Sequence, residues 1–294
     1  MSRLPTGIWI FFGLALLSLT LASGCRPLQV NNLADRLKAS NERDWSREYS
    51  TLPYATGNSD GTIELRNIRN NLYLSSDDFV PQYYDRTFHI SDIRSVDFIV
   101  CPFRGMEYIA HTMLSFRLAD DTHIGVSAEI RTEKAEEYSP YQGFVRQYEL
   151  TYVVADERDI IRLRTRHRDS DVYLYRTVAN AEQAQALFVD MMERANKLAQ
   201  KPEFYNTLAN NCTTNILDRV NRIKPGRLFY NWKVFLPGYS AKYAYDEGIL
   251  DQSRPFEQLK QEAWINDLAA RHFEDPDFSR KLREDLNRRR QPSR

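Results

Sequence analysis

The chain has 294 residues, with 40 basic and 40 acidic side chains, so its formal net charge is zero. This balance argues against a general nucleic-acid-binding protein, which would carry an excess of basic residues. Charged residues make up 27% and apolar residues 42%, as in an ordinary globular protein, and the length suits one large domain or a domain with appendages.

Residues 1–25 have the pattern of a bacterial lipoprotein signal peptide. Arg3 precedes an apolar run from Ile8 to Leu21, and small residues then lead directly into Cys25. A charged start, a short apolar segment and a small-residue cleavage site are typical of secretion signals. The run of roughly 14 residues is short for the ~20 that span a bilayer, although an uncleaved anchor is the alternative. We therefore expect an exported chain, lipidated at Cys25 and tethered to the periplasmic face of a bacterial membrane.

The segment after the signal predicts a tether followed by a sheet. Residues 26–61 are polar and irregular, with several turn-forming residues, and are predicted to form the tether. From residue 62 onward, short runs rich in β-branched and aromatic residues are separated by turn signals, as in strands. Ala119-Asp120-Asp121-Thr122 is such a signal and predicts a hairpin. The predicted strands cover residues 62–68, 82–90, 96–103, 109–118, 123–131, 147–154, 159–165 and 172–178.

After residue 180 the hydrophobic period becomes that of a helix. One helix is predicted between Asn180 and Pro202, and a second from the region of Cys212 to Pro225. The sequence thus indicates an α+β fold in which an antiparallel-rich sheet precedes helices.

The domain boundaries follow from this change of pattern. We expect the functional domain to cover residues 62–252. Residues 253–294 are expected to form a charged tail of two amphipathic helices, interrupted at Asp275-Pro276.

Cys212 is the candidate nucleophile. Asn211 is a good N-cap, so Cys212 falls in the first turn of the predicted helix, where the helix dipole stabilises a thiolate and lowers the thiol pKa. An activated cysteine of this kind attacks carbonyl carbons. The alternative is that Cys212 is a small buried apolar residue, as most free cysteines are. A disulfide between Cys101 and Cys212 is a further alternative in an exported protein, and it would remove the nucleophile.

His111 is the candidate base among five histidines. It opens a predicted strand, and the strand after the hairpin carries Glu129. If the hairpin loop has an odd number of residues centred on Asp120, His111 lies opposite Glu129, whose carboxylate could orient the ring. An even loop would place Ile130 there instead. The alternative is a half-buried strand histidine bonded to the backbone.

Several segments resemble one known family in the same order. The chain resembles the Lnb N-terminal periplasmic domain over about residues 62–252. The segments that carry this resemblance are Asp97-Phe98-Ile99-Val100, Ile109-Ala110-His111-Thr112-Met113-Leu114-Ser115-Phe116, Ser127-Ala128-Glu129-Ile130-Arg131, Gln147-Tyr148-Glu149-Leu150, Asp156-Glu157-Arg158-Asp159, Val172-Tyr173-Leu174-Tyr175, Pro202-Glu203-Phe204-Tyr205-Asn206 and Asn210-Asn211-Cys212-Thr213-Thr214-Asn215.

The resemblance implies a fold and a chemistry. The family looks like a permuted relative of papain and NlpC/P60 thiol enzymes, and its namesake is a lipoprotein N-acyltransferase. Carried over, Cys212 is the nucleophile and His111 the base, an acyl-thioester forms, and an amine or water takes the acyl group. Glu129 is our inferred third member. Backbone N–H groups at the helix start, with Asn211 and Thr213, are expected to hold the oxyanion.

The expected substrates are acyl groups of membrane lipids or lipoproteins. The namesake's domain precedes a membrane-spanning region, and this chain has no later apolar run of about 20 residues, so hydrolysis or a separate membrane partner is also expected. Two other functions remain open: a cell-wall peptidase or amidase of the same thiol class, and a non-catalytic lipoprotein that binds an envelope partner. No metal or nucleotide motif is present, and we expect no cofactor.

Overall fold

The computed structural model describes residues 38–136 and 148–290 of the chain. Its compact body comprises the described residues from Ala39 onward. The predicted signal sequence and Cys25 lie outside the described residues.

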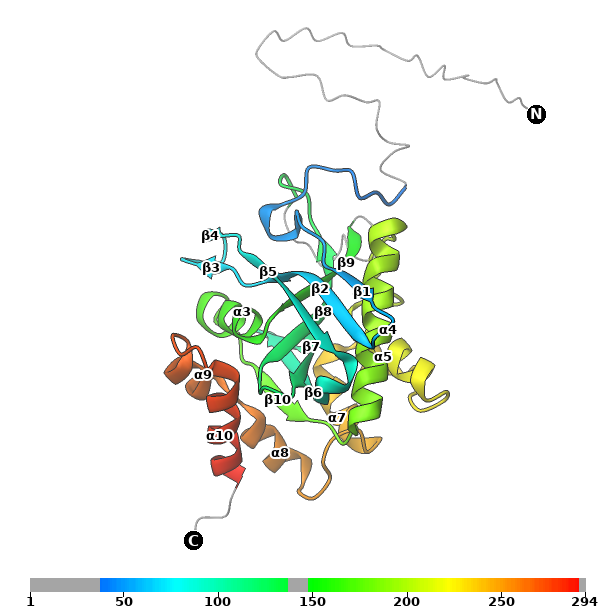
Figure 1. The fold of residues 1–294 in the computed structure, drawn as a ribbon. Coiled ribbons are helices and arrows are strands. Elements are labelled where there is room, and N and C mark those ends of the chain that lie inside the picture. The colour runs from blue at the N-terminus through cyan, green and yellow to red at the C-terminus, as the bar shows by residue number, and fades with distance from the viewer. Residues whose placement is uncertain (1–37, 137–147, 291–294) are drawn as a thin grey trace, which may run out of the picture. The chain divides into compact units, whose positions relative to one another are not determined.

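A mixed sheet forms the centre of this body (Figure 1). Its strand order is β1-β2-β9-β8-β7-β6-β10, and β5 pairs with β2. The pairing of β2 with β9 is parallel and the others are antiparallel. A separate small hairpin is formed by β3 (Leu72–Tyr73) and β4 (Phe79–Val80). The sheet strands are β1 (Tyr54–Gly57), β2 (Thr62–Arg69), β5 (Tyr83–His89), β6 (Ile93–Phe103), β7 (Met106–Leu118), β8 (His123–Arg131), β9 (Glu149–Asp156) and β10 (Tyr173–Arg176).

Helices cover both faces of the sheet. In Figure 1, α4 and α5 lie on one side of it, and α3, α9 and α10 lie on the other. The α-helices are α3 (Glu157–Arg162), α4 (Ala181–Gln200), α5 (Cys212–Ile223), α6 (Trp232–Phe235), α7 (Ser240–Asp246), α8 (Phe256–Ala263), α9 (Asn266–His272) and α10 (Phe278–Arg290). The expected α+β class, with a sheet followed by helices, is confirmed.

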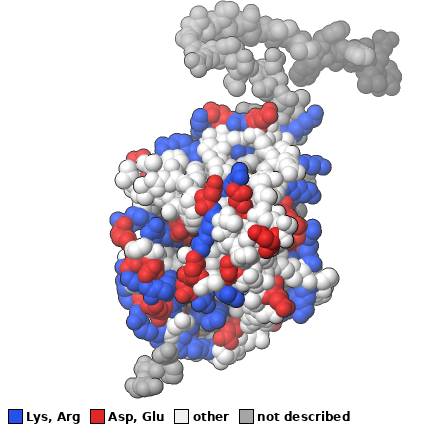
Figure 2. Space-filling view, viewed as in Figure 1, with Lys and Arg blue, Asp and Glu red and all other residues white. Residues whose placement is uncertain are grey.

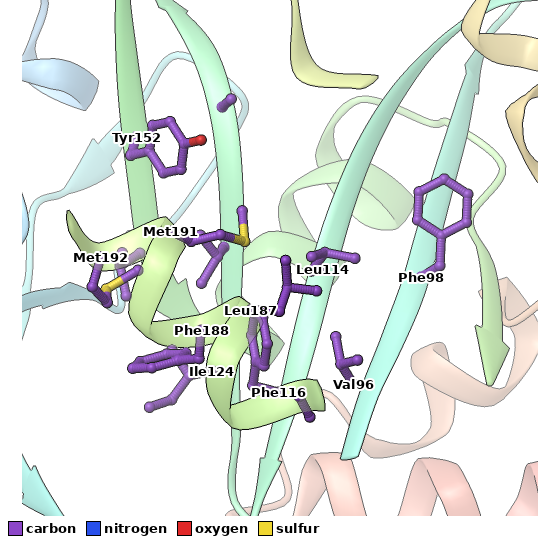
Figure 3. Close-up of a cluster of buried hydrophobic side chains, with 14 of the residues drawn as sticks. Val96, Phe98, Leu114, Phe116, Ile124, Tyr152, Leu187, Phe188, Met191 and Met192 are labelled. Atoms are coloured by element: carbon purple, nitrogen blue, oxygen red, sulfur yellow. The ribbon is translucent and has the colours of Figure 1, made fainter. Parts of the chain in front are cut away.

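The alternation along the strands sends each face to a different set of helices. Residues with even numbers on β7 and β8, such as Leu114 and Phe116, pack against α4, whereas Met113 belongs to the core shared with α3, α9 and α10. Figure 3 shows the first core, in which Leu187 and Phe188 of α4 face the strand side chains. The core on each face is therefore encoded by the two-residue period of the strands.

The predicted helix boundaries at Asn180 and Asn211 are confirmed. Both asparagines form capping boxes, in which the side chain accepts the N–H of the third helical residue and that residue's side chain bonds back.

One predicted strand is wrong. Residues 159–165 form the end of α3 and a π-helical turn, because Asp156 caps the segment by accepting the N–H of Arg158 at 2.9 Å. A short apolar run cannot be assigned to strand or helix by its period alone. Ile160 of this helix packs directly on Gly125, where a Cβ would lie 2.2 Å from the end of the Ile160 side chain.

Two other segments differ from their predictions. Tyr54–Gly57, within the predicted tether, pairs with β2 as the outermost strand β1. The tail contains three helices instead of two, because the chain turns at Trp264 between α8 and α9. The predicted break at Asp275-Pro276 does separate α9 from α10.

The visible surface carries charges of both signs. In Figure 2, Lys and Arg side chains are interspersed with Asp and Glu side chains over this face, in keeping with the net charge of zero. This face therefore offers no broad single-sign surface for a polyanion.

Candidate active site

Cys212 is the first residue of α5, and the cap on that helix fixes its position. Asn211 Oδ1 accepts the N–H of Thr214 at 2.8 Å, and Thr214 Oγ1 accepts the N–H of Asn211 at 2.8 Å. The thiol is buried, with 4% of the residue exposed, and lies 3.9 Å from the carbonyl oxygen of Ala110 on β7. The cysteine therefore sits at the positive end of the helix dipole, as expected.

β7 and β8 separate where α5 meets them. Their ladder runs from Arg117 opposite His123 to Leu114 opposite Val126. Beyond this point β8 remains paired with β9, and α5 contacts both β7 and β8. The hydroxyls of Thr112 on β7 and Thr213 on α5 are 3.0 Å apart. The start of α5 is thus held against the strands at the place where they diverge.

The hairpin has the odd register that places His111 on the side of Glu129. The N–H of Leu118 bonds the carbonyl of Thr122 at 2.8 Å, so the loop is centred on Asp120. His111 Nε2 lies 2.7 Å from Ser127 Oγ and 3.4 Å from Glu129 Oε1. Ser127 Oγ in turn donates to the same carboxylate oxygen at 2.8 Å. The Nε2 side of the ring therefore faces the Ser127–Glu129 pair.

Glu129 is anchored by two further side chains. Arg164 Nη2 donates to Glu129 Oε1 at 3.0 Å, and the Tyr49 hydroxyl donates to Oε2 at 2.9 Å. Both partners are buried. These bonds account for the lone pairs of a carboxylate that would be costly to bury alone.

The electrostatics favour an ionised thiol. Burial raises the pKa of Cys212, but the hydrogen bond with His111 and the charge of that ring outweigh it, so the pKa falls to about 7. Burial and the charge of Arg164 lower the pKa of His111, whereas its bonds with Cys212 and Glu129 raise it, and the net shift is upward. Burial raises the pKa of Glu129, but His111 and Arg164 hold it well below its usual range. A substantial fraction of Cys212 is therefore thiolate near neutral pH, beside a histidine whose pKa is raised and a carboxylate that stays ionised.

Cys101 is a free thiol, as is Cys212, so the two do not form a bridge in this structure. Cys101 is opposite His111 in the ladder between β6 and β7. Burial raises its pKa to about 12. The two cysteines thus have opposite chemical character although they lie near the same histidine.

The side chains of Asn211 and Thr213 are used to hold the helix. Asn211 Nδ2 donates to the Thr207 carbonyl at 2.6 Å, and its oxygen makes the cap. Helical bonding starts with the N–H of Asn215, which bonds the Asn211 carbonyl at 3.0 Å. The backbone N–H groups of Cys212 and Thr213 precede these bonds, so they are better placed than the two side chains to hold an oxyanion.

An apolar cavity of about 370 Å³ adjoins the start of α5. Thr213, the neighbour of Cys212, lines it, as does the apolar stripe of α5. Its volume lies in the range of roughly 300–1,000 Å³ that is usual for small-molecule pockets. The other lining residues are mostly aliphatic and include Val96, Phe98, Leu114, Leu187, Val234 and Ile249.

The described residues provide neither a metal site nor a membrane-spanning helix. In the ranges 38–136 and 148–290, no group of three or more His, Cys, Asp or Glu side chains is placed to hold a metal ion. Within the same ranges, no helix combines the length and the apolar character needed to cross a bilayer.

The model of the Lnb N-terminal periplasmic domain family matches residues 79–239, which include His111, Glu129 and Cys212. The chain belongs to this family. The family's name indicates a periplasmic protein of the bacterial envelope. No curated protein and no solved structure matches the chain. The matched range ends at residue 239, so α7, α8, α9 and α10 lie outside it.

The sequence prediction missed Ser127, Arg164 and Tyr49. Ser127 lies two residues before Glu129 on β8, on the side that faces His111 of β7, and this alternation is visible in the sequence. Arg164 and Tyr49 carry no comparable signal. Arg164 lies in an arginine-rich run whose pattern predicts a strand, and Tyr49 lies in the segment predicted to be a tether.

Proposed function

We propose that this chain is a cysteine-dependent acyltransferase or acyl hydrolase of the bacterial envelope, acting through an acyl-thioester on Cys212. The observation that carries the proposal is the buried Cys212 thiol at the first residue of α5, 3.9 Å from the carbonyl of Ala110, the neighbour of His111, whose ring faces Ser127 and Glu129. The His111 ring lowers the pKa of this thiol to about 7 against the opposing effect of burial. A histidine base beside a cysteine at a helix start is the arrangement of a papain-like thiol enzyme, here with the histidine strand preceding the cysteine helix.

The chemistry would proceed in two halves. His111 takes the proton of the Cys212 thiol, and the thiolate attacks the carbonyl carbon of an acyl ester. The oxyanion is held by the backbone N–H groups at the start of α5. The intermediate collapses, the alcohol leaves with the proton from His111, and the thioester remains. An amine or water then attacks, gives a proton to His111, and releases an amide or a free acid together with the thiolate.

The apolar cavity supports an acyl substrate over a cell-wall peptide. Thr213, the chain neighbour of the nucleophile, is among its lining residues, and the lining is mainly aliphatic. Transfer of an acyl chain from water into such a cavity is favourable. Peptide groups would lose their hydrogen bonds to water there, which is unfavourable. The acyl donor is proposed to be a membrane lipid or lipoprotein, and a separate membrane partner could supply the acceptor.

Covalent capture tests the proposal. The full chain and its Cys212→Ala variant are incubated with lipid extract and examined by intact-mass and peptide mass spectrometry. The expected result is an acyl mass on the peptide containing Cys212 that hydroxylamine removes and that the variant lacks. A folded wild-type chain that acquires no acyl mass, or the same mass on the variant, would contradict an acyl-thioester mechanism.

Lipid anchoring is proposed on the sequence pattern around Cys25. Mass spectrometry of the mature chain should find Cys25 as the first residue, carrying diacylglycerol. A mature chain that retains residues 1–24 would count against this anchor.

A further inference from the structure

Exposed aromatic side chains recur along residues 228–239, a segment that contributes to the lining of the apolar cavity. Two residues of this segment, Leu228 and Val234, line the cavity. The aromatic residues between and beyond them are exposed, up to 67% for Phe229 and 56% for Trp232. We call this set the aromatic rim; its members are Phe229, Tyr230, Trp232, Phe235 and Tyr239.

The aromatic rim is an ordered part of the fold. The Tyr243 hydroxyl bonds both the N–H and the carbonyl of Phe229 at 2.8 Å. Four rings of the aromatic rim pack in two pairs. The ring centroids of Trp232 and Tyr239 are 5.0 Å apart, and those of Tyr230 and Phe235 are 6.2 Å apart. The exposure is therefore built into the structure and does not come from a frayed loop.

The aromatic rim is fixed to the strand that carries His111. The backbone of Gly238 packs directly on β7, because a Cβ at this glycine would lie 1.9 Å from the Glu107 carbonyl oxygen. Tyr108, the next residue on β7, is itself 47% exposed and extends the apolar surface. The segment from Leu228 to Tyr239 thus connects the exposed aromatic residues, the cavity lining and the strand that carries His111.

The composition of this surface fits a lipid bilayer. Large exposed apolar patches mark interaction sites, and tryptophan and tyrosine are the residues enriched at membrane–water interfaces. Two lysines within and just after the aromatic rim, Lys233 and Lys242, both pair with Asp246, so their charges are neutralised locally. This charge balance favours contact with an uncharged or zwitterionic surface over a strongly acidic partner.

We propose that the aromatic rim docks the domain on a lipid bilayer, with the cavity mouth facing the membrane. One acyl chain of a membrane lipid then passes from the bilayer across the rim into the cavity, where its ester carbonyl comes beside Cys212. The choice of a lipid rests on the proposed acyl chemistry. The docking itself requires no turnover and can be measured in an inert protein.

Fluorescence quenching measures the contact directly. The full chain carrying Trp9→Phe and Cys212→Ala is reconstituted in phosphatidylcholine vesicles, with or without bromine on the acyl chains. Bromine quenches tryptophan that touches the acyl region. Trp45 is buried and Trp264 bonds Asp171, whereas Trp232 is exposed, so the quenched emission should come from Trp232. Adding Trp232→Phe should remove the quenched component.

Matched variants separate docking from general tethering. Phe229→Asp with Phe235→Asp should abolish the quenching of Trp232, because charged side chains cannot enter the interface without a large desolvation cost. Leu74→Asp is the control: Leu74 is 76% exposed but lies beside the β3–β4 hairpin, so its replacement should leave the quenching unchanged. Circular dichroism of each variant checks that the fold is kept.

The outcomes distinguish the docking from the chemistry. Equal Trp232 emission in plain and brominated vesicles would overturn the docking. Self-association in sedimentation that is lost in Phe229→Asp, without quenching, would assign the rim to a second copy of the chain and also overturn it. Quenching without an acyl adduct on Cys212 would leave the docking intact and reject the proposed function, and an adduct without quenching would do the reverse.

Discussion

At the scale of single residues, the candidate site is organised around one buried carboxylate. Glu129 is 6% exposed and meets Arg164, Tyr49, Ser127 and the His111 ring. Arg164 has two opposed effects: it keeps Glu129 ionised, and its own charge lowers the pKa of His111. Burial also lowers the His111 pKa, but the bonds of the ring with Cys212 and Glu129 and the charge of Cys212 outweigh both effects, so the His111 pKa rises.

Replacing this carboxylate should slow the acylation of Cys212. Glu129→Gln keeps the shape but removes the charge that stabilises the imidazolium, so we expect the acylation rate to fall on the order of 100-fold, within the usual range for acid–base catalysis. Ser127→Ala is the milder comparison and should cost about 1 kcal/mol, or roughly fivefold in rate, for one lost hydrogen bond. The rates are measured with a soluble thiol-reactive ester. Equal effects of the two substitutions would argue against a charge role for Glu129.

A second histidine makes the fold sensitive to mild acid. Burial, with the charge of Arg283, lowers the pKa of His123 to about 4. An unfolded histidine titrates near 6.5, so the unfolded chain binds a proton at His123 more readily than the folded protein does. The free energy of unfolding is therefore at its full value above pH 6.5 and falls as the pH drops towards 4. The loss between pH 7 and pH 5 should be about 2 kcal/mol. Urea unfolding at both pH values checks it, and His123→Gln should have a flatter dependence; an unchanged slope would contradict the assignment.

At the scale of elements, two local features bring the cysteine to the histidine. The capping box on Asn211 fixes where α5 begins, and the separation of β7 from β8 after Leu114 provides the place where the helix start fits. The first feature follows from the sequence Asn211-Cys212-Thr213-Thr214. The second does not, because strand divergence depends on side chains from several elements.

Removing the cap should both destabilise the fold and weaken the thiol. Asn211→Ala should lower the free energy of unfolding by about 0.5–2 kcal/mol, the usual value of an N-cap. It should also raise the Cys212 pKa, since a frayed first turn no longer aims its N–H groups at the sulfur. Asn211→Ser retains a capping oxygen and should preserve most of both properties. Chemical denaturation and thiol labelling measure the two effects, and a stable Asn211→Ala protein with an unchanged thiol would contradict the role of the cap.

At the scale of the whole molecule, the last helix is tied to the sheet by buried charge. Arg283 of α10 donates to Asp97 at 2.7 Å and to Glu157 at 2.6 Å, joining the tail to β6 and α3. All three residues lie on the face opposite α4 and α5. The tail therefore completes the core of this face although it lies outside the range matched by the family model.

Breaking this tie should strongly destabilise the protein. Arg283→Met leaves two buried carboxylates without their cation and should cost about 3–5 kcal/mol, as when one member of a buried ion pair is removed. Arg280→Ala removes a surface arginine that pairs with Asp277 and Glu284, and it should leave the unfolding midpoint close to that of the wild type because solvent screens such pairs. Urea denaturation of both variants provides the comparison. Similar stability of the two would mean that α10 does not depend on the buried pairs.

The sequence predicts the local parts of this site better than the connections between them. The cap at Asn211, the hairpin turn around Asp120 and the alternation that brings His111 to the side of Glu129 are all short-range patterns. Tyr49 reaches Glu129 from 80 residues away in the chain, and Arg164 does so from a helix mistaken for a strand. Contacts of this kind arise from tertiary packing, which leaves no periodic signal in the residues themselves.

The activation of Cys212 by His111 is tested most directly by the pH dependence of its alkylation. The rate of iodoacetamide labelling at Cys212 should rise with a midpoint near pH 7, and Cys101 should remain unlabelled in the folded protein. In His111→Gln the midpoint should move above about 8.5, the free-thiol value, since burial then acts without the imidazole. A wild-type midpoint at or above about 8.5, or a midpoint that His111→Gln leaves unchanged, would contradict the account.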